Sequence, residues 1–399
     1  MNLKQNNNIE YLVGEGNISN TPIQPYNKIV CNFLNELSIA LRNHKQIKEY
    51  PDVMAFAFWC RKANINKLIS EFKEDRTRLG LGLVFHIAPS NVPVNFAFSF
   101  VFGLLSGNAN IVRVPSKDFP QVYIICSAVQ ELLNNKQYDT IRDMSAFVKY
   151  ERDDEITALY SKNCNARIIW GGDNTIWNIR MLPIPARCID IAFADRYSFS
   201  IINAEEIIQT NDFDLERLVE GFYNDTYLMD QNACSSPHLV VWLGENKEEA
   251  QNKFWNSLYI KVKNDYELAP VTAVDKYTLL CENSIDLNNI QEFKKFDNLL
   301  YIVKIDKLSE DIDKYHGKFG YFFEYNGSSL NELAFIVNNK YQTLTYYGIE
   351  KSNLINFVTD NSLLGIDRIV PIGQAMDMTV IWDGYDIVRS LSRIIDIKG

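Results

Sequence analysis

Short apolar runs alternate with helix-like segments through most of this chain, and this alternation restricts its fold more than any other feature. Each run is apolar at successive positions, so a strand built from it would be buried on both faces. Strands of that kind belong to parallel sheets covered by helices. The sequence therefore predicts an α/β protein. The expected strands are 83–88, 109–114, 145–148, 166–170, 189–193, 199–202, 239–243, 300–303, 320–323 and 343–347.

The length of 399 residues predicts two domains, because it exceeds what one simple core holds. We expect residues 1–203 to form N-terminal helices and a nucleotide-binding domain, which the tail 366–399 rejoins with a final helix reaching residue 397. Residues 204–365 are expected to form a second α/β domain. Phenylalanines alternate from Phe96 to Phe102 as in a strand, yet the segment lies between a proline and a glycine at helical length, which favours a buried helix.

Charge and cysteine usage exclude several classes of protein. The formal charge of -10 argues against a general nucleic-acid binder, which needs a basic face. Seven cysteines without a C-x-x-C pair indicate free thiols in a reducing compartment. The first residues lack the apolar core of a secretory signal, and the longest apolar run, 92–105, is interrupted and too short to span a bilayer. We therefore expect a cytoplasmic protein with no membrane span, no metal site and no nucleic-acid partner.

Cys234 is the candidate nucleophile. It lies in a short link between a helix-like segment, 214–228, and the strand expected at 239–243, where a side chain can project into a cleft. A buried structural thiol stays an alternative, since cysteine is among the most buried residue types. His238 could form a Cys–His pair, although Pro237 and the start of the strand favour a histidine that is only hydrogen-bonded.

Two strand ends carry candidate cofactor residues. Gly171 and Gly172 end the strand expected at 166–170, and such a turn before a helix lets a phosphate approach the backbone amides. A tight turn without a ligand explains this pair equally well. After the strand at 109–114, Arg113, Ser116 and Lys117 occupy the link that usually holds an acidic residue for the ribose of NAD. A hydroxyl and a cation there favour the 2′-phosphate of NADP, whereas the neighbouring Asp118 and a merely solvated lysine are the counter-arguments.

Asn91 follows the strand expected at 83–88. It could cap the next helix, or its amide could join the backbone amide of Cys234 in an oxyanion hole. His86 lies inside the apolar strand and is expected to be structural.

Together these segments resemble the aldehyde dehydrogenase superfamily, and more narrowly its LuxC-like acyl-CoA reductases, the long-chain fatty-acid reductases. The motifs occur in the right order and span most of the chain from residue 80 onward. The broad likeness lies in Ser90–Pro93, Gly107–Ser116, Gly171–Gly172 and Asp230–Cys234, and the narrow one in His86–Pro93, Ile169–Asp173, Cys234–Pro237 and Trp382–Tyr385.

The resemblance implies a Rossmann-like cofactor domain, a catalytic domain and a cleft between them. By position, Cys234 matches the nucleophile and Asn91 the oxyanion amide, while Gly171 and Gly172 match the cofactor turn. Ser90, in the turn that holds Asn91, is a further expected cofactor contact.

Two departures from the superfamily pattern bear on the chemistry. Phe319 resembles the residue that contacts the nicotinamide ribose, although Gly317 stands where a glutamate is usual. Hydrolytic members also place a glutamate just before the strand expected at 199–202, where this chain has only Asp195 as a carboxylate. The missing glutamate suits an acyl-enzyme that must survive until it is reduced.

The implied activity is NADPH-dependent reduction of a long-chain fatty acyl thioester, either acyl-CoA or acyl-protein, to the aldehyde through acyl-Cys234. The same resemblance implies an acyl-protein synthetase as partner, and homo-oligomeric assembly stays open. The alternatives are a cysteine-dependent acyltransferase or thioesterase without nicotinamide chemistry, and a binding protein without turnover.

Overall fold

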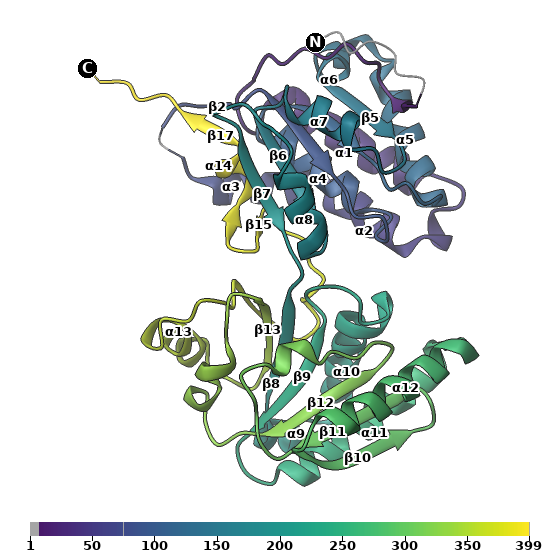
Figure 1. Cartoon of the computed structure of the whole chain (residues 1–399), viewed down its shortest axis with the longest axis vertical. Coiled ribbons are helices and arrows are strands. Elements are labelled where there is room, and N and C mark those ends of the chain that lie inside the picture. The colour runs from purple at the N-terminus through teal and green to yellow at the C-terminus, as the bar shows by residue number, and fades with distance from the viewer. Residues whose placement is uncertain (1–7, 75, 399) are drawn as a thin grey trace. The chain divides into compact units, whose positions relative to one another are not determined.

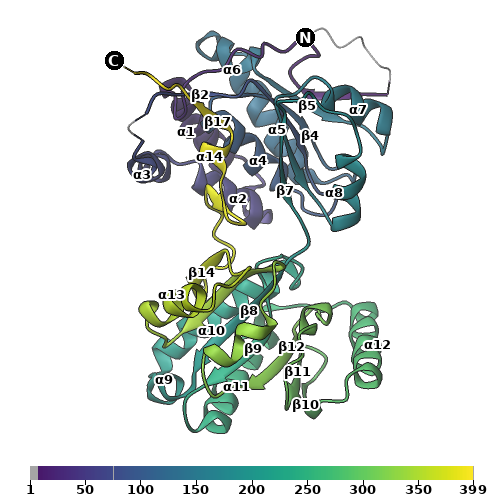
Figure 2. The ribbon, with the colours of Figure 1, turned by 60° about the vertical axis from the view of Figure 1, so that its left-hand side comes forward.

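The computed structural model describes residues 8–74 and 76–398. They form two compact units, one made of the residues up to Ala194 together with those from Tyr385 onward, and the other of Asp195–Gly384 (Figures 1 and 2). Each unit has its own sheet and its own helices, which confirms the expected α/β class.

The sheet of the first unit has the strand order β1-β5-β4-β3-β6-β7. Its strands are β1 (Glu10–Val13), β3 (Leu83–Ile87), β4 (Ala109–Arg113), β5 (Ser145–Lys149), β6 (Ala166–Trp170) and β7 (Ile189–Phe193). β3 to β7 run parallel, and β1 is antiparallel to β5. The chain therefore winds outward from β3, first through β4 and β5 and then through β6 and β7. Numbered from β3, the parallel strands have the order 3-2-1-4-5, which is that of a doubly wound nucleotide-binding fold without its sixth strand.

Helices pack on both faces of this sheet because its central strands are buried on both sides. They are α1 (Lys28–Arg42), α2 (Pro51–Trp59), α3 (Lys62–Phe72), α4 (Asn95–Leu105), α5 (Pro120–Leu133), α6 (Asp139–Asp143), α7 (Asp154–Ser161), α8 (Asp173–Arg180) and α14 (Ile387–Ser390), with short 3-10 turns η1 (Ile47–Glu49) and η2 (Lys136–Tyr138). α4 confirms the helix expected across the alternating phenylalanines. Phe100 packs edge-on against Phe147 of β5, and Phe98 and Phe102 pack against Trp59 of α2, so this aromatic stripe is core.

The sheet of the second unit has the order β10-β11-β12-β9-β8-β13-β14, and its strands are parallel except for the antiparallel edge strand β10. The strands are β8 (Tyr197–Asn203), β9 (Pro237–Leu243), β10 (Ile290–Phe296), β11 (Leu300–Ile305), β12 (Tyr321–Asn326), β13 (Tyr341–Tyr347) and β14 (Arg368–Pro371). The helical segments are α9 (Ala204–Gln209), α10 (Asp212–Thr226), η3 (Tyr227–Met229), α11 (Lys247–Asp265), α12 (Pro270–Asp286), η4 (Ile312–Lys314), η5 (Asn331–Ile336) and α13 (Lys351–Asp360).

Successive residues of the central strands point to opposite faces, which explains why these strands are apolar throughout. Val240 and Trp242 of β9 pack in a cluster with α9, α10 and α11. Leu239 and Val241 pack in the cluster on the opposite face, to which η5 and α13 contribute. Burial on both faces fixes the register of β9 and therefore the position of the segment that precedes it.

Two segments lie in a different sheet from the one expected. β8 pairs with β9 and β13, and β14 pairs with β13, so both belong to the second sheet. The division of the chain accordingly falls at 194/195 and 384/385 instead of 203/204 and 365/366. An apolar strand read from sequence carries no mark of which of two sheets it joins, and only its pairing decides.

The expected final helix up to residue 397 is wrong. The tail forms the short helix α14 and then β17 (Ser392–Ile394), which pairs antiparallel with β2 (Arg78–Gly80). A short hairpin, β15 (Ile381–Trp382) and β16 (Tyr385–Asp386), precedes it. Within residues 8–74 and 76–398, no helix is both long enough and apolar enough to cross a membrane.

Candidate active site

Cys234 lies in the loop Asp230–Ser236, here called the Cys234 loop, which connects η3 with β9. Asp230 and Gln231 both adopt left-handed backbone conformations, with φ of 52° and 58°. Such conformations cost energy in non-glycine residues and persist only where the surrounding structure enforces them. Strain of this kind concentrates at functional sites. Cys234 is an exposed residue, although the protein around it still desolvates its sulfur.

Gln231 enforces the conformation of the loop. Its side chain is fully buried and makes four hydrogen bonds, all to backbone groups. Nε2 donates to the carbonyls of Pro237 (2.9 Å) and Tyr321 (3.0 Å), and Oε1 accepts from the amides of Gly320 and Tyr321 (both 3.1 Å). The amide of Phe319, the residue before Gly320, donates to Asp230 O at 3.1 Å. The Cys234 loop and the start of β12 are therefore joined as one piece.

Phe319 is held from its other side by a buried lysine. Phe319 has a φ of +59°, and its carbonyl accepts a 2.7 Å hydrogen bond from Lys276 Nζ of α12. The Lys276 ammonium also lies over the ring of Tyr301, 4.4 Å from the centroid. Burial, with a smaller contribution from Lys295, lowers the pKa of Lys276 to about 7. Lys276 thus holds the peptide of Phe319 in place, and its own protonation changes near neutral pH. It lies on α12, a helix that the sequence did not suggest.

A second set of hydrogen bonds fixes the backbone of Cys234, the candidate nucleophile. Ser198 Oγ of β8 donates to Cys234 O at 2.7 Å and accepts from the amide of Thr343 at 3.1 Å. Ser236 Oγ donates to the carbonyl of Asp225 in α10 at 2.7 Å. The main chain of Cys234 is therefore tied to β8, β13 and α10, while its thiol remains accessible. Every segment in this network precedes or begins a parallel strand, so the site lies at the amino-terminal edge of the second sheet.

The charges around the thiol favour its protonated form. Desolvation by the surrounding protein, together with the carboxylates of Asp383 and Asp195, raises the pKa of Cys234 to about 11 against the opposing charge of Arg196. Asp383 belongs to the Trp382–Tyr385 motif, has a φ of +48°, and accepts a hydrogen bond from Gln342 Nε2. Burial raises the pKa of Asp383 to about 6, with Arg196 acting in the opposite direction. The resting sulfur is therefore a thiol at neutral pH.

His238 is engaged away from Cys234. Its Nδ1–H donates to the carbonyl of Gly317 at 3.0 Å, and its ring stacks on Tyr197. Burial and the neighbouring His316 lower the pKa of His238 to about 3. A buried histidine with this partner fits the hydrogen-bonded role that its sequence position favours.

His86 is structural, as expected. It is fully buried, its Nδ1 lies 2.8 Å from Ser99 Oγ, and its Nε2 lies 2.9 Å from Asn110 Oδ1. Burial lowers its pKa to about 4, so the ring is neutral.

The expected cofactor residues of the first unit gather at one edge of its sheet. Ser90 and Asn91 follow β3, Ser116 and Lys117 follow β4, and the glycine pair follows β6. These strands are neighbours and run parallel, so their carboxyl ends lie side by side. The winding of the chain reverses between β3 and β6, and this is the position where open α/β sheets bind their ligands.

Gly172 meets the steric requirement for an approaching phosphate. It is the N-cap of α8, with φ of -66° and no side chain capping the helix. A Cβ built at Gly172 would meet nothing within 4 Å, whereas one at Gly171 would approach Thr175 at 3.2 Å. The space beside Gly172 is therefore open in front of a helix amino terminus, an arrangement that suits an anion.

The charged residues at and after the end of β4 differ in whether neighbouring side chains already occupy them. Arg113 is stacked on Tyr150, 4.4 Å from the ring centroid, and its guanidinium donates to the Tyr150 carbonyl. Asp118, the counter-argument to a 2′-phosphate, is ion-paired with Lys149 and accepts a 2.8 Å hydrogen bond from Tyr123. Lys117 is exposed, and its ammonium lies over Phe119. Lys117 is thus the more available cation of the two expected ones.

Asn91 does not cap the following helix. α4 begins at Asn95, its N-cap is Val94, and no side chain makes a capping hydrogen bond there. Asn91 lies in the preceding turn with an exposed side chain. The helix-capping interpretation is therefore wrong, and the catalytic one stays a prediction.

A profile of the acyl-CoA reductase (LuxC) family matches residues 67–395. The chain belongs to this family. The match confirms the narrow resemblance inferred from the motifs, and it leaves out the first N-terminal helices. Among the described residues, no cluster of three or more His, Cys, Asp or Glu side chains is arranged to hold a metal ion.

The chain is similar to two named long-chain acyl-protein thioester reductases. It is 24% identical over 304 residues to the long-chain acyl-protein thioester reductase of Aliivibrio fischeri, covering 73% of this chain and 58% of the relative. It is 21% identical over 324 residues to the protein of the same name from Vibrio harveyi, covering 79% and 63%. The chain thus spans about three fifths of the length of these relatives.

A solved structure shares the fold. Aldehyde dehydrogenase 21 from Physcomitrella patens superposes with a TM-score of 0.63 and 10% identity, covering 92% of this chain and 85% of the other. At this identity the likeness establishes the aldehyde-dehydrogenase-like fold. It says nothing about the substrate.

Sequence reasoning missed Gln231, Lys276 and Ser198 as members of the site. Gln231 stands three residues before Cys234, and its signal is a long amide side chain in a link that otherwise carries turn residues. Lys276 and Ser198 have no comparable signal, since their contacts come from elements far away in the chain.

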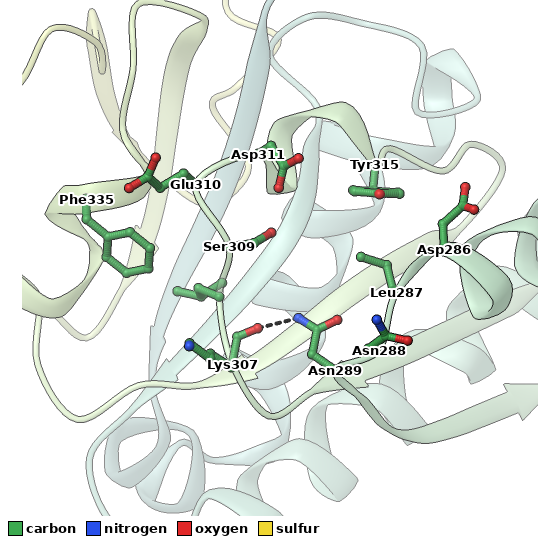
Figure 3. A pocket seen from close by; sticks show the side chains of 11 residues that line it. Asp286, Leu287, Asn288, Asn289, Lys307, Ser309, Glu310, Asp311, Tyr315 and Phe335 are labelled. Atoms are coloured by element: carbon green, nitrogen blue, oxygen red, sulfur yellow. Dashed lines mark hydrogen bonds between the residues drawn. The ribbon is translucent and has the colours of Figure 1, made fainter.

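One hollow of the second unit has a volume of about 560 Å³ and is unrelated to Cys234. Figure 3 shows its walls, in which Asn289 donates to the carbonyl of Lys307. The lining segments follow β11 or precede its antiparallel neighbour β10, which places the hollow at the carboxyl edge of the sheet. The Cys234 loop lies at the opposite edge. The lining residues are Asp286, Leu287, Asn288, Asn289, Lys307, Leu308, Ser309, Glu310, Asp311, Tyr315 and Phe335.

Proposed function

We propose that the protein reduces fatty acyl thioesters to aldehydes with a nicotinamide cofactor, using Cys234 as the acyl carrier. The observation that carries this proposal is the Cys234 loop, where an exposed thiol sits on a strained backbone that Gln231 and Ser198 hold in place. Membership of the acyl-CoA reductase family supports it.

Cys234 attacks the carbonyl of the acyl thioester and expels the carrier thiol, leaving acyl-Cys234. Exchange of one thioester for another is nearly balanced in energy, so the main requirement is removal of the thiol proton. The pKa of about 11 keeps that proton on the sulfur in the free protein. Asp383, whose carboxylate is buried in the same charge cluster, is the group we expect to influence this step most.

The residues for the cofactor lie at the carboxyl edge of the first sheet. Gly171 and Gly172 with the start of α8 are suited to its phosphates, and Lys117 with Ser116 to a 2′-phosphate, which favours NADPH. We expect Phe319 to contact the nicotinamide ribose, as in the superfamily. When bound, the cofactor supplies the hydride that converts the acyl group to the aldehyde oxidation level.

Asn91 and the backbone amide of Cys234 are our candidates for stabilising the oxyanion of the tetrahedral adduct. Preorganised donors of this kind are among the largest contributions to acyl-transfer catalysis. Asp195, the carboxylate near the position of the hydrolytic glutamate, is exposed. We expect this exposed carboxylate not to replace the missing glutamate, so that acyl-Cys234 survives until it is reduced.

The acyl donor is expected to be long-chain, presented on CoA or on a protein. The names of the relatives support a protein-bound thioester and, through it, an acyl-activating synthetase as partner.

The test is to mix the protein with a long-chain acyl-CoA and NADPH, following NADPH absorbance and free CoA separately. Loss of NADPH absorbance together with aldehyde supports the reductase. Release of CoA without NADPH consumption would instead indicate a transferase or thioesterase. If neither CoA release nor NADPH consumption occurs, the protein does not turn over this substrate. Cys234→Ser should abolish both signals, whereas Cys281→Ser, which removes another exposed thiol, should change neither.

A further inference from the structure

Two thiols of the first unit lie in contact with each other. The sulfurs of Cys164 and Cys188 are 3.7 Å apart, and both cysteines are free. Cys164 precedes β6 and Cys188 precedes β7, which are parallel neighbours. Just beyond the pair, the amide of Ile189 donates to Asn165 O at 3.3 Å. The backbone therefore holds both cysteines at the starts of two adjacent strands.

The two sulfurs differ in access. Cys164 is buried, with 1% of its surface exposed, and its Sγ lies 3.3 Å from the carbonyl oxygen of Ser161. Cys188 is half-buried, and residues 185–187 before it are exposed. A reagent from solvent therefore reaches Cys188 first, and Cys164 lies behind it.

The surroundings make Cys188 the more acidic thiol. The contact with Cys164 lowers the pKa of Cys188 and raises that of Cys164, whereas burial and the carboxylate of Asp190 raise the pKa of Cys188 and Arg167 lowers it by the smallest amount. Arg167 is fully buried and forms a bidentate pair with Asp190, at 2.7 Å for both bonds. This ion pair fixes both charged groups beside the two sulfurs.

Two further cations flank the site. Arg187 is exposed directly before Cys188, and Arg180 lies 3.9 Å from Asp190 with half of its side chain exposed. Arg167, Arg180 and Arg187 together outnumber the one carboxylate among them, Asp190. This local excess of positive charge attracts anionic reagents to a protein that is acidic overall.

We propose that Cys164 and Cys188 form a redox-active dithiol that anionic small-molecule disulfides of the glutathione type oxidise to an intramolecular disulfide. The thiolate of Cys188 attacks one sulfur of the reagent, forms a mixed disulfide and expels one thiolate. Cys164 then loses its proton and attacks Cys188 Sγ, which expels the second thiol of the reagent. The protein loses two electrons and two protons, and the reagent disulfide becomes two thiols.

The bond would close a loop that contains β6, the Gly171–Gly172 turn and α8. Closing a loop of this length restricts the unfolded chain and stabilises the folded one. We expect the unfolding midpoint of the first unit to rise on the order of 5 °C upon oxidation. The inference goes beyond the proposed function and does not depend on it, because its readouts require neither substrate nor nicotinamide.

The experiment treats the reduced full-length chain with oxidised glutathione, quenches free thiols with N-ethylmaleimide and maps peptides without reduction. We expect a cross-linked peptide joining Cys164 to Cys188, reversed by dithiothreitol. Cys164→Ser should instead accumulate the glutathione adduct on Cys188, about tenfold above the wild-type level, because the neighbouring thiol that resolves it is missing. Cys188→Ser should leave Cys164 largely unmodified.

Three results would overturn the inference. One is a stable glutathione adduct on wild-type Cys188 with no cross-link. Another is Cys188→Ser in which Cys164 reacts as fast as Cys188 does in the wild type. The third is faster oxidation by the cationic disulfide cystamine than by oxidised glutathione, which would remove the assignment of an anionic reagent. The exposed Cys281 serves as the internal reference for general thiol reactivity in every sample.

Discussion

Replacing Gln231 by alanine should detach the Cys234 loop from β12. The side chain makes four hydrogen bonds to backbone groups inside the protein. A protein hydrogen bond contributes about 1 kcal/mol net, and a buried backbone group left without a partner costs about 1–3 kcal/mol. We therefore expect Gln231→Ala to lower the free energy of unfolding of the second unit by roughly 4 kcal/mol, with water entering the space keeping the loss near this value.

Gln231→Glu separates the hydrogen bonds from the shape of the side chain. Glutamate keeps both accepted bonds but turns an oxygen toward the carbonyls of Pro237 and Tyr321, which the amide now donates to. Burial raises the pKa of such a carboxyl group, so the loss of stability should be largest at high pH and shrink as the pH falls and the group becomes protonated. The recovery at low pH distinguishes charge from packing.

The assay is urea unfolding of both variants, monitored by tryptophan fluorescence, alongside the alkylation rate of Cys234. The matched control is Asn232→Ala, because Asn232 lies in the same loop but is exposed and donates to the carbonyls of Met229 and Asp230 at 3.3 and 3.1 Å. Surface substitutions of this kind change stability by about 0.5 kcal/mol or less. If Gln231→Ala costs no more than Asn232→Ala, Gln231 does not hold the loop.

Four further predictions concern the chemistry. Alkylation of Cys234 by iodoacetamide should rise about tenfold per pH unit up to its pKa of about 11, and Asp383→Asn should move this midpoint to lower pH by removing a negative charge. Gly172→Ala should change stability by less than about 1 kcal/mol, because the gain from a less flexible unfolded chain opposes the loss of a favoured N-cap residue, while raising the KM for the nicotinamide. Asn91→Ala should slow acyl reduction by roughly two to three decades without changing the unfolding midpoint. Lys117→Ala should raise the KM for NADPH far more than that for NADH.

Each of these predictions has a result that contradicts it. Asp195→Asn, which removes an exposed carboxylate, should shift the alkylation midpoint less than Asp383→Asn, and a larger shift would reverse their order. Gly171→Ala should cost stability through its contact with Thr175, so equal behaviour of the two glycine variants would argue against an open space at Gly172. A near-normal turnover removes Asn91 from the site, and equal changes for both cofactors remove Lys117.

The sequence was sufficient for the class of the fold and for the helix α4, because burial on both faces of a strand and helix-length spacing are local properties. It also located Cys234 in an accessible link. It could not assign the strand expected at 199–202, β8, to its sheet, since any strand apolar on both faces fits either one. β14 was not expected as a strand, because only part of its short segment is apolar. β2 and β17 pair across more than three hundred residues, and no local pattern records such a pairing.

The contacts that hold the Cys234 loop could not be predicted from the sequence either. Gln231 and Phe319 adopt left-handed conformations without being glycine, so residue type gives no signal of them. Lys276 comes from α12, where a charged residue on a helix is ordinarily solvated. The motif that contains Asp383 was recognised by its resemblance to the family. That the charge of Asp383 acts on Cys234 could not be predicted, because it depends on how separate segments of the chain come together.

The protonated state of Cys234 has a consequence for selective inhibition. Electrophiles that react only with a thiolate will react slowly with Cys234, because its raised pKa keeps it protonated. They will react more readily with Cys188, whose pKa is lowered by its neighbour Cys164. Compounds that resemble the acyl thioester, for which the thiol proton is lost only during the attack, will react with Cys234 in preference to Cys188. A covalent probe for Cys234 should therefore carry a weak electrophile on an acyl chain instead of a strongly reactive group.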